Sequence, residues 1–275
     1  MGQLPMHDVL LLIAVLGYLG AVTLLYYSVL RESRSLTRAS VALVCIGAVA
    51  HAAAQYHHWV PLGGQEVSVL NVLSLCALVV VLLLIASLTM KEPLYHAGLV
   101  ILPIAIAALL LEWGIAAPGN LIASGEPGLS IHIICAVMAF GLLSIAAVYA
   151  VFVALIDHFL RQRRLNRIVR TLPGLVVLEG HLFQLITAGF IFLTIALAVG
   201  LTFVTDLFAQ HLAHKTILAI LAWLVFGVLL WGRYFRGWRG RLAVRMTLAG
   251  MLILLLSYFG SKLVLEVILH SGWRV

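Results

Sequence analysis

The sequence predicts an all-α integral membrane protein, a polytopic helical bundle of eight transmembrane helices with both termini on the outer (periplasmic) side. The first observation is composition. Hydrophobic residues make up 64% of the 275 positions, and the mean hydropathy is +1.15, whereas an ordinary soluble domain is roughly 45–50% apolar. The second observation is that the few charged residues, 10% of the chain, leave uncharged stretches close to the ~20 residues that a spanning helix needs. The third is the distribution of lysine and arginine.

Eight stretches without Asp, Glu, Lys or Arg follow one another, and each is a candidate transmembrane helix. They are Val9–Leu30, Ala39–Gln65, Val67–Met90, Pro93–Leu111, Pro127–Ile156, Gly180–Thr205, Thr216–Gly232 and Met246–Ser261. The longest connections, Trp59–Val67 and Gly114–Leu129, are expected to be loops without regular structure. The sequence shows no convincing internal repeat, so we expect a single membrane domain over residues 1–275.

The basic residues collect in alternate connections, and this sets the orientation. Of the 17 Lys and Arg residues, 14 fall in the connections at 31–38, 91–93, 157–178 and 233–245. The positive-inside rule places these connections in the cytoplasm and both termini outside. The pI of 9.7 therefore reflects topology. No connection is long enough for a nucleic-acid-binding domain, so we expect no nucleic-acid partner and anionic membrane lipids at the arginine-rich connection.

The sequence shows no sign of an enzyme. The three cysteines fall inside predicted helices at unrelated spacings, which excludes a zinc or disulfide pattern, and no C-x-x-C-H motif for covalent haem attachment occurs. No hydrolase elbow, phosphate loop or zincin motif is present. The carboxylates Glu66, Glu112 and Glu126 are scattered over the outer connections. We therefore expect no catalytic residues and no metal site formed by these cysteines and carboxylates.

One stripe of polar residues climbs the second predicted helix. Gly47, His51, Gln55 and His58 follow the spacing i, i+4, i+8 and i+11, so they share one helix face. Such a stripe inside a membrane must face protein or water. An interhelical hydrogen bond and a functional role for His51 are about equally supported, because ionisable residues inside a membrane are functional candidates by default.

A second pair of histidines lies at one level of the predicted bundle. His132 opens the fifth predicted helix at its outer end, and His270 follows the eighth helix at the same level. Neutral imidazoles delivered to one layer by two helices are suited to binding haem iron or another metal. Interfacial capping is the alternative, and spacing alone does not choose between them.

Several ordered motifs recur through most of the chain. They are GAVAHAAA (47–54), SVLNVLSL (68–75), AGFIFLTIALAVG (188–200), KTILAILAWLVFGVLLWGR (215–233), RGWRGRLAV (236–244), SYFG (257–260) and LHSG (269–272). Together they resemble the cytochrome c assembly protein family, the CcsA-type membrane proteins that handle haem. The resemblance extends from about residue 45 onward, and the arginine-rich connection is one of its marks.

The resemblance implies a set of haem ligands. In this family haem is held by two histidines within the membrane and two at the outer face, beside a tryptophan-rich outer loop. His51 matches the first intramembrane histidine, and His132 and His270 match the outer pair. Lys215 and Trp223 match the lysine after that loop and a tryptophan in the next helix. Three of the four family ligands are therefore present, and the haem is expected to be b-type and non-covalently bound.

The chain departs from the family pattern at two places. Trp231 stands where the family has its second intramembrane histidine, and the connection at 205–216 contains no tryptophan. These departures resemble a smaller branch of the family, the HemX-like and YpjD-like membrane proteins. Asn71, Trp231 and Tyr258, which lie in the matching motifs, are candidates for residues that line the haem site.

The sequence thus predicts a haem-binding protein of the bacterial inner membrane that stores, relays or senses haem near the outer face. His132 and His270 are the expected axial ligands, and His51 is expected to act mainly through helix packing or hydrogen bonding. Other cytochrome assembly proteins or membrane complex subunits are possible partners.

Two other functions stay open at this point. One is a small-solute transporter or channel lined by polar residues of the second, third and sixth predicted helices, which are His51, Gln55, Asn71, Gln184 and Thr187. The other is a structural subunit of a membrane complex that binds no haem.

Overall fold

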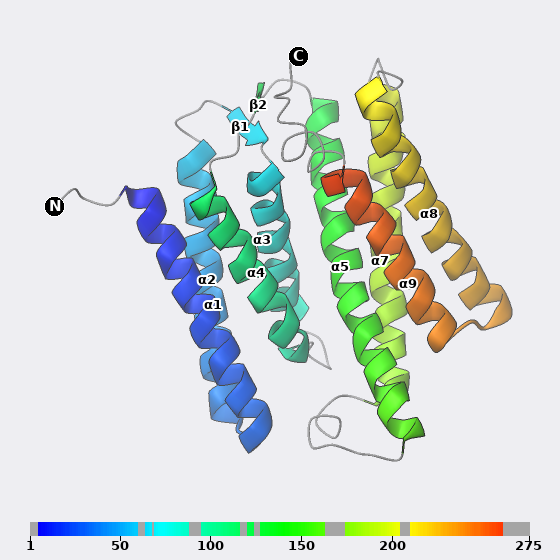
Figure 1. Ribbon diagram of the computed structural model, residues 1–275, viewed down its shortest axis with the longest axis horizontal. Helices are drawn as coiled ribbons and strands as arrows, with labels where there is room; N and C mark the ends of the chain where they lie inside the picture. The colour runs from blue at the N-terminus through cyan, green and yellow to red at the C-terminus, as the bar shows by residue number, and fades with distance from the viewer. Residues whose placement is uncertain are drawn as a thin grey trace. The chain divides into compact units, whose positions relative to one another are not determined.

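The computed structural model describes residues 5–59, 64–67, 69–87, 95–115, 120–123, 127–162, 174–203 and 210–260. It confirms the predicted all-α class of a polytopic membrane protein (Figure 1). Within the described residues, seven helices are long and apolar enough to cross a membrane. In the same residues, the one other long helix, Gly98–Gly114, is also apolar but has only 17 residues.

The helices divide into two compact units. The first unit contains α1 (Met6–Arg31), α2 (Arg34–Trp59), α3 (Val69–Ser87) and α4 (Gly98–Gly114), which follows a short 3-10 turn at Tyr95–Ala97. The second unit contains α5 (Pro127–Arg161), α7 (Leu175–Phe203), α8 (Gln210–Arg236) and α9 (Arg241–Leu255), which continues as a π-helical segment at Leu256–Gly260. The expectation of one domain over the whole chain stays an expectation, and each unit is described by itself.

In the first unit, α1 and α2 pack at a contact of two glycines. A Cβ atom added at Gly17 would lie 3.0 Å from the Cα of Gly47, and one added at Gly47 would lie 2.7 Å from the ring of Tyr18. The missing side chains let the two backbones approach closely, as small residues do in membrane helix pairs. The Tyr18 ring therefore lies over Gly47, on the polar stripe of α2.

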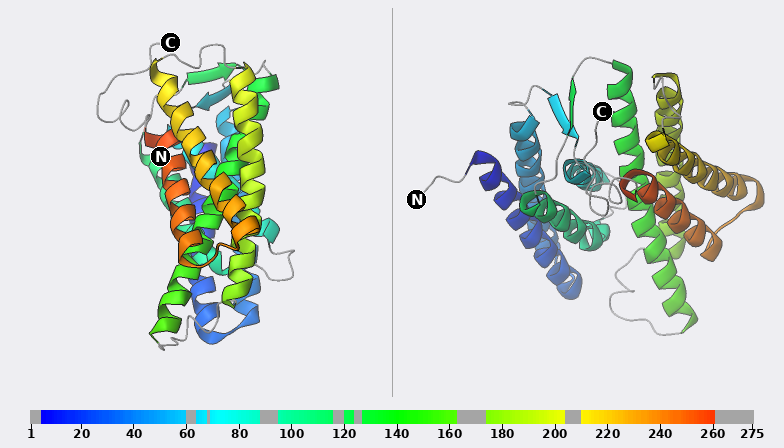
Figure 2. Two further views of the ribbon diagram at one scale, coloured as in Figure 1. Left: turned by 90° about the vertical axis from the view of Figure 1, so that its right-hand side faces the viewer. Right: turned by 45° about the horizontal axis from the view of Figure 1, so that its top comes forward.

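The first unit also contains a small β-ribbon that the sequence did not predict. β1 (Gly64–Val67) follows α2, and β2 (Asn120–Ala123) follows α4. They pair antiparallel with Gly64 opposite Ala123 and Val67 opposite Asn120, side by side in Figure 2. The expectation that these two connections lack regular structure was therefore wrong, because strands of four residues are too short to show a periodic pattern.

In the second unit, α5 and α7 pack along most of their lengths. Helix α5 has 35 residues, about 52 Å at 1.5 Å per residue, so it is longer than the ~30 Å hydrocarbon core. A Cβ atom at Gly189 of α7 would lie 2.7 Å from Leu143 of α5. Because Gly189 has no side chain, the Leu143 side chain fits between α5 and α7.

Helices α8 and α9 complete the second unit. A Cβ atom at Gly250 of α9 would lie 2.8 Å from the ring of Phe226 in α8. On α8, the Trp223 ring stacks on Phe190 of α7 at 5.5 Å between centroids, and its indole N–H donates to the Thr194 hydroxyl at 2.9 Å. In the π-helical segment after α9, the hydroxyl of Ser257 donates to the Lys215 carbonyl oxygen at 2.8 Å.

The basic connections are shorter than the sequence suggested. The predicted connection at 233–245 is a turn of residues 237–240, since α8 continues to Arg236 and α9 begins at Arg241. Likewise α5 continues to Arg161. Arginine is a good helix former, so the helices extend beyond the apolar stretches into the region of the charged residues.

Large apolar side chains are exposed along the helices of both units. Examples are Leu16 at 56%, Ile134 at 61% and Leu252 at 58% exposed. In water such surfaces would mark interaction sites, but membrane helices present apolar side chains to lipid. The exposed apolar surface and the apolar helix lengths together indicate that the bundle lies in a bilayer.

Candidate functional site

His132 is held by the helix that packs against its own. It lies in the second turn of α5, and its Nδ1 atom is 2.8 Å from the carbonyl oxygen of Ala196 in α7. One turn further along α7, a Cβ atom at Gly200 would lie 2.9 Å from both Cε1 and Nδ1 of the imidazole. Two small residues spaced i, i+4 therefore form the surface on which the His132 ring rests.

The hydrogen bond to Ala196 fixes which nitrogen of His132 carries the proton. A carbonyl oxygen can only accept, so Nδ1 must be the donor. In the neutral imidazole, Nε2 then carries a lone pair, and it has no hydrogen-bond partner among the described residues. Histidines that bind metals typically donate their other ring N–H to a carbonyl oxygen or carboxylate in this way, which orients the ring.

The donor set fits an axial ligand of haem iron. Haem binds imidazole through one neutral ring nitrogen, and His132 offers such a nitrogen in a fixed orientation. The second expected ligand, His270, lies outside the described residues. Within those residues, no group of three or more His, Cys, Asp or Glu side chains is placed to hold a metal ion by itself.

Tyr258 is linked to α5 through an aromatic neighbour. It sits in the π-helical segment after α9 and meets Phe259 edge to face, with 4.9 Å between centroids. Phe259 in turn contacts Phe140 of α5 at 5.7 Å. Phe140 is eight residues after His132, which is about 12 Å along α5 and about 80° around its axis. Tyr258 is therefore brought to the same helix as the candidate ligand.

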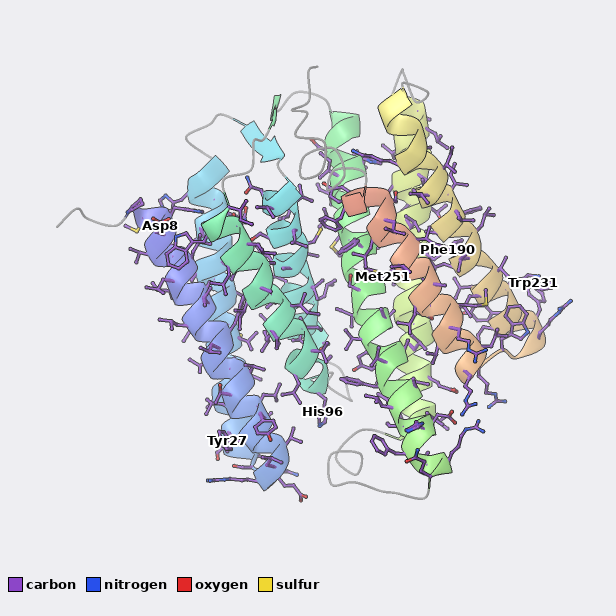
Figure 3. The ribbon with its side chains drawn as sticks, viewed as in Figure 1. Asp8, Tyr27, His96, Phe190, Trp231 and Met251 are labelled. Atoms are coloured by element: carbon purple, nitrogen blue, oxygen red, sulfur yellow. The ribbon has the colours of Figure 1, made fainter. Side chains whose placement is uncertain are left out.

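Trp231 is placed elsewhere. It lies 16 residues after Lys215, which holds the π-helical segment through its carbonyl oxygen, and this spacing is about 24 Å along α8. Its side chain is 47% exposed and points away from the bundle of the second unit (Figure 3). Trp231 thus does not line a common site with His132 and Tyr258 in this unit.

His51 in the first unit has both ring nitrogens engaged. Nε2 is 2.9 Å from the hydroxyl of Ser74 in α3, and Nδ1 is 3.3 Å from the hydroxyl of Tyr18 in α1. The residue is 0% exposed. With both nitrogens hydrogen-bonded, neither is open to a metal, so this arrangement is the one expected for a histidine that joins helices.

A polar cluster continues from His51 to the end of α4. The Gln55 amide nitrogen donates to Ser74 at 2.9 Å and to the carboxylate of Glu112 at 3.1 Å. Asn71, one turn before Ser74 on α3, is also buried, with 8% exposed. The carboxylate of Glu112 therefore belongs to a helix and a polar cluster, and the expectation that it lies on an outer connection was wrong.

This cluster joins all four helices of the first unit. Tyr18 comes from α1, His51 and Gln55 from α2, Ser74 from α3 and Glu112 from α4. One buried atom, the amide oxygen of Gln55, has no hydrogen-bond partner among the described residues. Two residues of the polar stripe predicted on α2, His51 and Gln55, thus face protein and form hydrogen bonds to neighbouring helices.

Sequence patterns found some of these residues and missed others. The helical spacing on α2 revealed His51 and Gln55. Ser74, three residues after Asn71 on an apolar helix, carried a weak signal of the same kind. Ala196, which orients His132, carried none, because its contribution is a backbone oxygen that every residue possesses.

The fold defines a class, a polytopic helical membrane protein. The chain matches the model of the family described as cytochrome C assembly protein over residues 10–269. It therefore belongs to the cytochrome c assembly protein family, as its motifs predicted.

Relatives of this chain include one that matches over nearly its whole length and one that matches over a shorter segment. It is 34% identical over 265 residues to the inner membrane protein YpjD of Escherichia coli strain K12, covering 94% of this chain and 98% of that protein. It is 33% identical over 99 residues to the cytochrome c biogenesis protein CcsA of Prochlorococcus marinus strain NATL1A, covering 35% and 31% of the two chains. No solved structure matches the chain.

Proposed function

We propose that this protein binds haem in the bacterial inner membrane and stores, relays or senses it near the outer face, without bond-making chemistry of its own. The observation that carries the proposal is the hydrogen bond from Nδ1 of His132 to Ala196, at 2.8 Å. It leaves Nε2 as the neutral nitrogen that haem iron binds. Membership of the cytochrome c assembly family supports the same ligand, and a full-length relative is described as an inner membrane protein.

The roles of the residues follow from their positions. His132 would hold the haem iron through Nε2, and the backbone of α7 sets its tautomer. His270, which lies outside the described residues, would supply the second imidazole. When bound, a b-type haem would supply an iron centre for these two nitrogens. Gly200 keeps the space for the His132 ring, and His51 holds the helices of the first unit together.

The proposed location near the outer face depends on the orientation. The connections at 31–38 and 237–240 and the end of α5 carry most of the described arginines, and the positive-inside rule assigns these ends to the cytoplasm. His132 lies near the opposite end of α5 from Arg161. It therefore faces the outer half of the membrane in this orientation.

The transporter interpretation is less well supported by the described residues. Gln184, one of its expected lining residues, is exposed, and the hydroxyl of Thr187 donates to the Phe183 carbonyl oxygen of its own helix at 2.8 Å. His51 is fully hydrogen-bonded between helices. These contacts are typical of packing in a membrane bundle rather than of a water-filled path.

A visible absorption spectrum tests the proposal. We expect detergent-purified protein, with haem added in a stoichiometric amount, to show a Soret band shifted from that of free haem in the same detergent. A bis-imidazole ligand set predicts a low-spin spectrum. If the protein stays colourless, or the spectrum equals that of haem in empty micelles, the haem function is wrong and a structural role takes its place.

A further inference from the structure

The corner between α8 and α9 carries five arginines, and two of them are engaged within the second unit. The guanidinium of Arg233 lies 4.5 Å from the centroid of the Phe183 ring and donates to the Trp238 carbonyl oxygen at 3.4 Å. The Nε atom of Arg241 donates to the carboxylate of Asp157 in α5 at 3.0 Å. These two arginines fasten the corner to neighbouring helices.

The other three, Arg236, Arg239 and Arg245, are exposed. None of them has a carboxylate partner in the part of the chain that the structure describes. The guanidinium of Arg236 lies 4.8 Å from the centroid of the Trp231 ring, a contact that leaves its N–H groups available to an acceptor. Among the described residues, three cationic groups within ten positions thus lack a counter-ion.

The backbone of the corner is held in one shape. The Gly240 N–H donates to the buried carboxylate of Glu179 in α7 at 2.9 Å, and the Trp238 N–H donates to the Gly232 carbonyl oxygen at 3.1 Å. The Trp238 ring packs directly on Gly232. Gly237 and Gly240 have φ values of 67° and 64°, which glycine adopts without strain. The exposed arginines are therefore presented from a rigid turn.

Exposed aromatic side chains lie on the last turns of α8, the helix that ends at Arg236. Trp231 is 47%, Tyr234 70% and Phe235 76% exposed. Exposed aromatic rings beside basic residues are typical of the boundary between lipid tails and headgroups. A soluble anion would not account for the exposed rings, whereas a lipid carries a phosphate for the arginines and acyl chains for the rings.

We propose that this corner is a binding site for an anionic phospholipid, whose phosphate is held by Arg236 and Arg239 with Arg245 beside them. The planar guanidinium group donates two parallel hydrogen bonds to a phosphate. The acyl chains lie along the exposed aromatic rings. The cytoplasmic leaflet, which this corner faces in the predicted orientation, is the leaflet that attracts basic segments electrostatically.

Native mass spectrometry of the delipidated full-length protein in detergent tests the site. Phosphatidylglycerol should bind with a defined stoichiometry, and phosphatidylcholine should bind much more weakly. The variant Arg236→Gln/Arg239→Gln should bind phosphatidylglycerol about 25-fold more weakly, on the basis of about fivefold for each arginine near an anionic surface. The variant Arg236→Lys/Arg239→Lys keeps both charges. Its affinity for phosphatidylglycerol should therefore fall by less than that of the glutamine variant, because only the bidentate hydrogen bonds are lost.

A matched control separates a site from general attraction. Arg34→Gln/Arg38→Gln removes the same charge from two exposed positions of α2 and should leave the affinity within about twofold. Equal weakening by both double variants would overturn the proposal, because the arginines would then act only through net charge. Competition by inorganic phosphate at the lipid's concentration would overturn it too, since it would indicate a site for soluble anions.

Discussion

His132 and His51 are both histidines on membrane helices, and their surroundings give them opposite properties. His132 meets a backbone carbonyl oxygen at one ring nitrogen, and its other nitrogen has no partner among the described residues. His51 meets hydroxyl groups at both nitrogens. A carbonyl oxygen only accepts, whereas a hydroxyl both donates and accepts. Two hydroxyls therefore satisfy both nitrogens of an imidazole, whereas one carbonyl satisfies only one of them.

The histidine substitutions test this difference most directly. We expect His132→Ala to remove most of the Soret absorbance per protein after haem is added, because an axial ligand is lost. His51→Ala should leave the band largely in place, since that ring contributes hydrogen bonds instead. The readout is the Soret absorbance of the reconstituted variants. The comparison fails if His51→Ala erases the band while His132→Ala retains it.

The surface beneath His132 gives a subtler test. Gly200→Ala places a methyl group 2.9 Å from the ring, so the imidazole must shift and its bond to Ala196 must lengthen. Changes to the hydrogen-bond partner of a metal-binding histidine lower metal affinity by about 10–100-fold. Haem titration should show a loss of haem affinity in that range. Gly180→Ala on the same helix is the control, because its Cβ meets nothing within 4 Å. Equal haem affinities in the two variants would contradict the orienting role.

The corresponding glycine beside His51 should affect stability instead of haem. In Gly47→Ala the new methyl group meets the Tyr18 ring at 2.7 Å, and overpacking of this kind costs about 1–3 kcal/mol. A lower midpoint of thermal unfolding in detergent, with unchanged haem affinity, is the expected result. Gly114→Ala, whose Cβ has open space around it, serves as the control. A loss of haem without a change in the midpoint would place the site in the first unit.

Removing one hydroxyl from the polar cluster tests whether its hydrogen bonds stabilise the first unit. Ser74→Ala leaves His51 and Gln55 without a shared partner, and an unsatisfied buried polar group costs about 1–3 kcal/mol. Thermal unfolding should therefore occur at a lower temperature than in the wild type. Ser35→Ala, at an exposed position, should lie within about 0.5 kcal/mol of the wild type. Equal stabilities of both variants would show that the cluster does not hold the four helices together.

A third histidine, His96, lies in the short turn before α4, and its effect on stability should appear only below about pH 6.5. Burial lowers the pKa of His96 from 6.5 to about 4. Between these values the unfolded chain binds a proton that the folded protein does not, so the free energy of unfolding decreases as the pH falls from about 6.5 to about 4. Thermal unfolding across this range should show a steeper loss of stability for the wild type than for His96→Gln. Parallel curves would contradict the prediction.

The sequence by itself determined the class of the protein and most of its helices. Whether a stretch of about 20 residues crosses the membrane depends on the apolar side chains of that stretch. Composition along the chain was therefore enough to predict the helices. The same local character made the stripe of His51 and Gln55 visible, because the 3.6-residue repeat alone places them on one face. Family motifs added His132 as a candidate ligand.

Only the tertiary structure decided which atoms each histidine meets. The partner of His132 is a backbone oxygen of Ala196, and the partners of His51 come from α1 and α3. The β-ribbon and the turn at 237–240 depended in the same way on segments that meet in space. A hydrogen bond is set by which atom of another helix lies opposite, and helix packing determines that position.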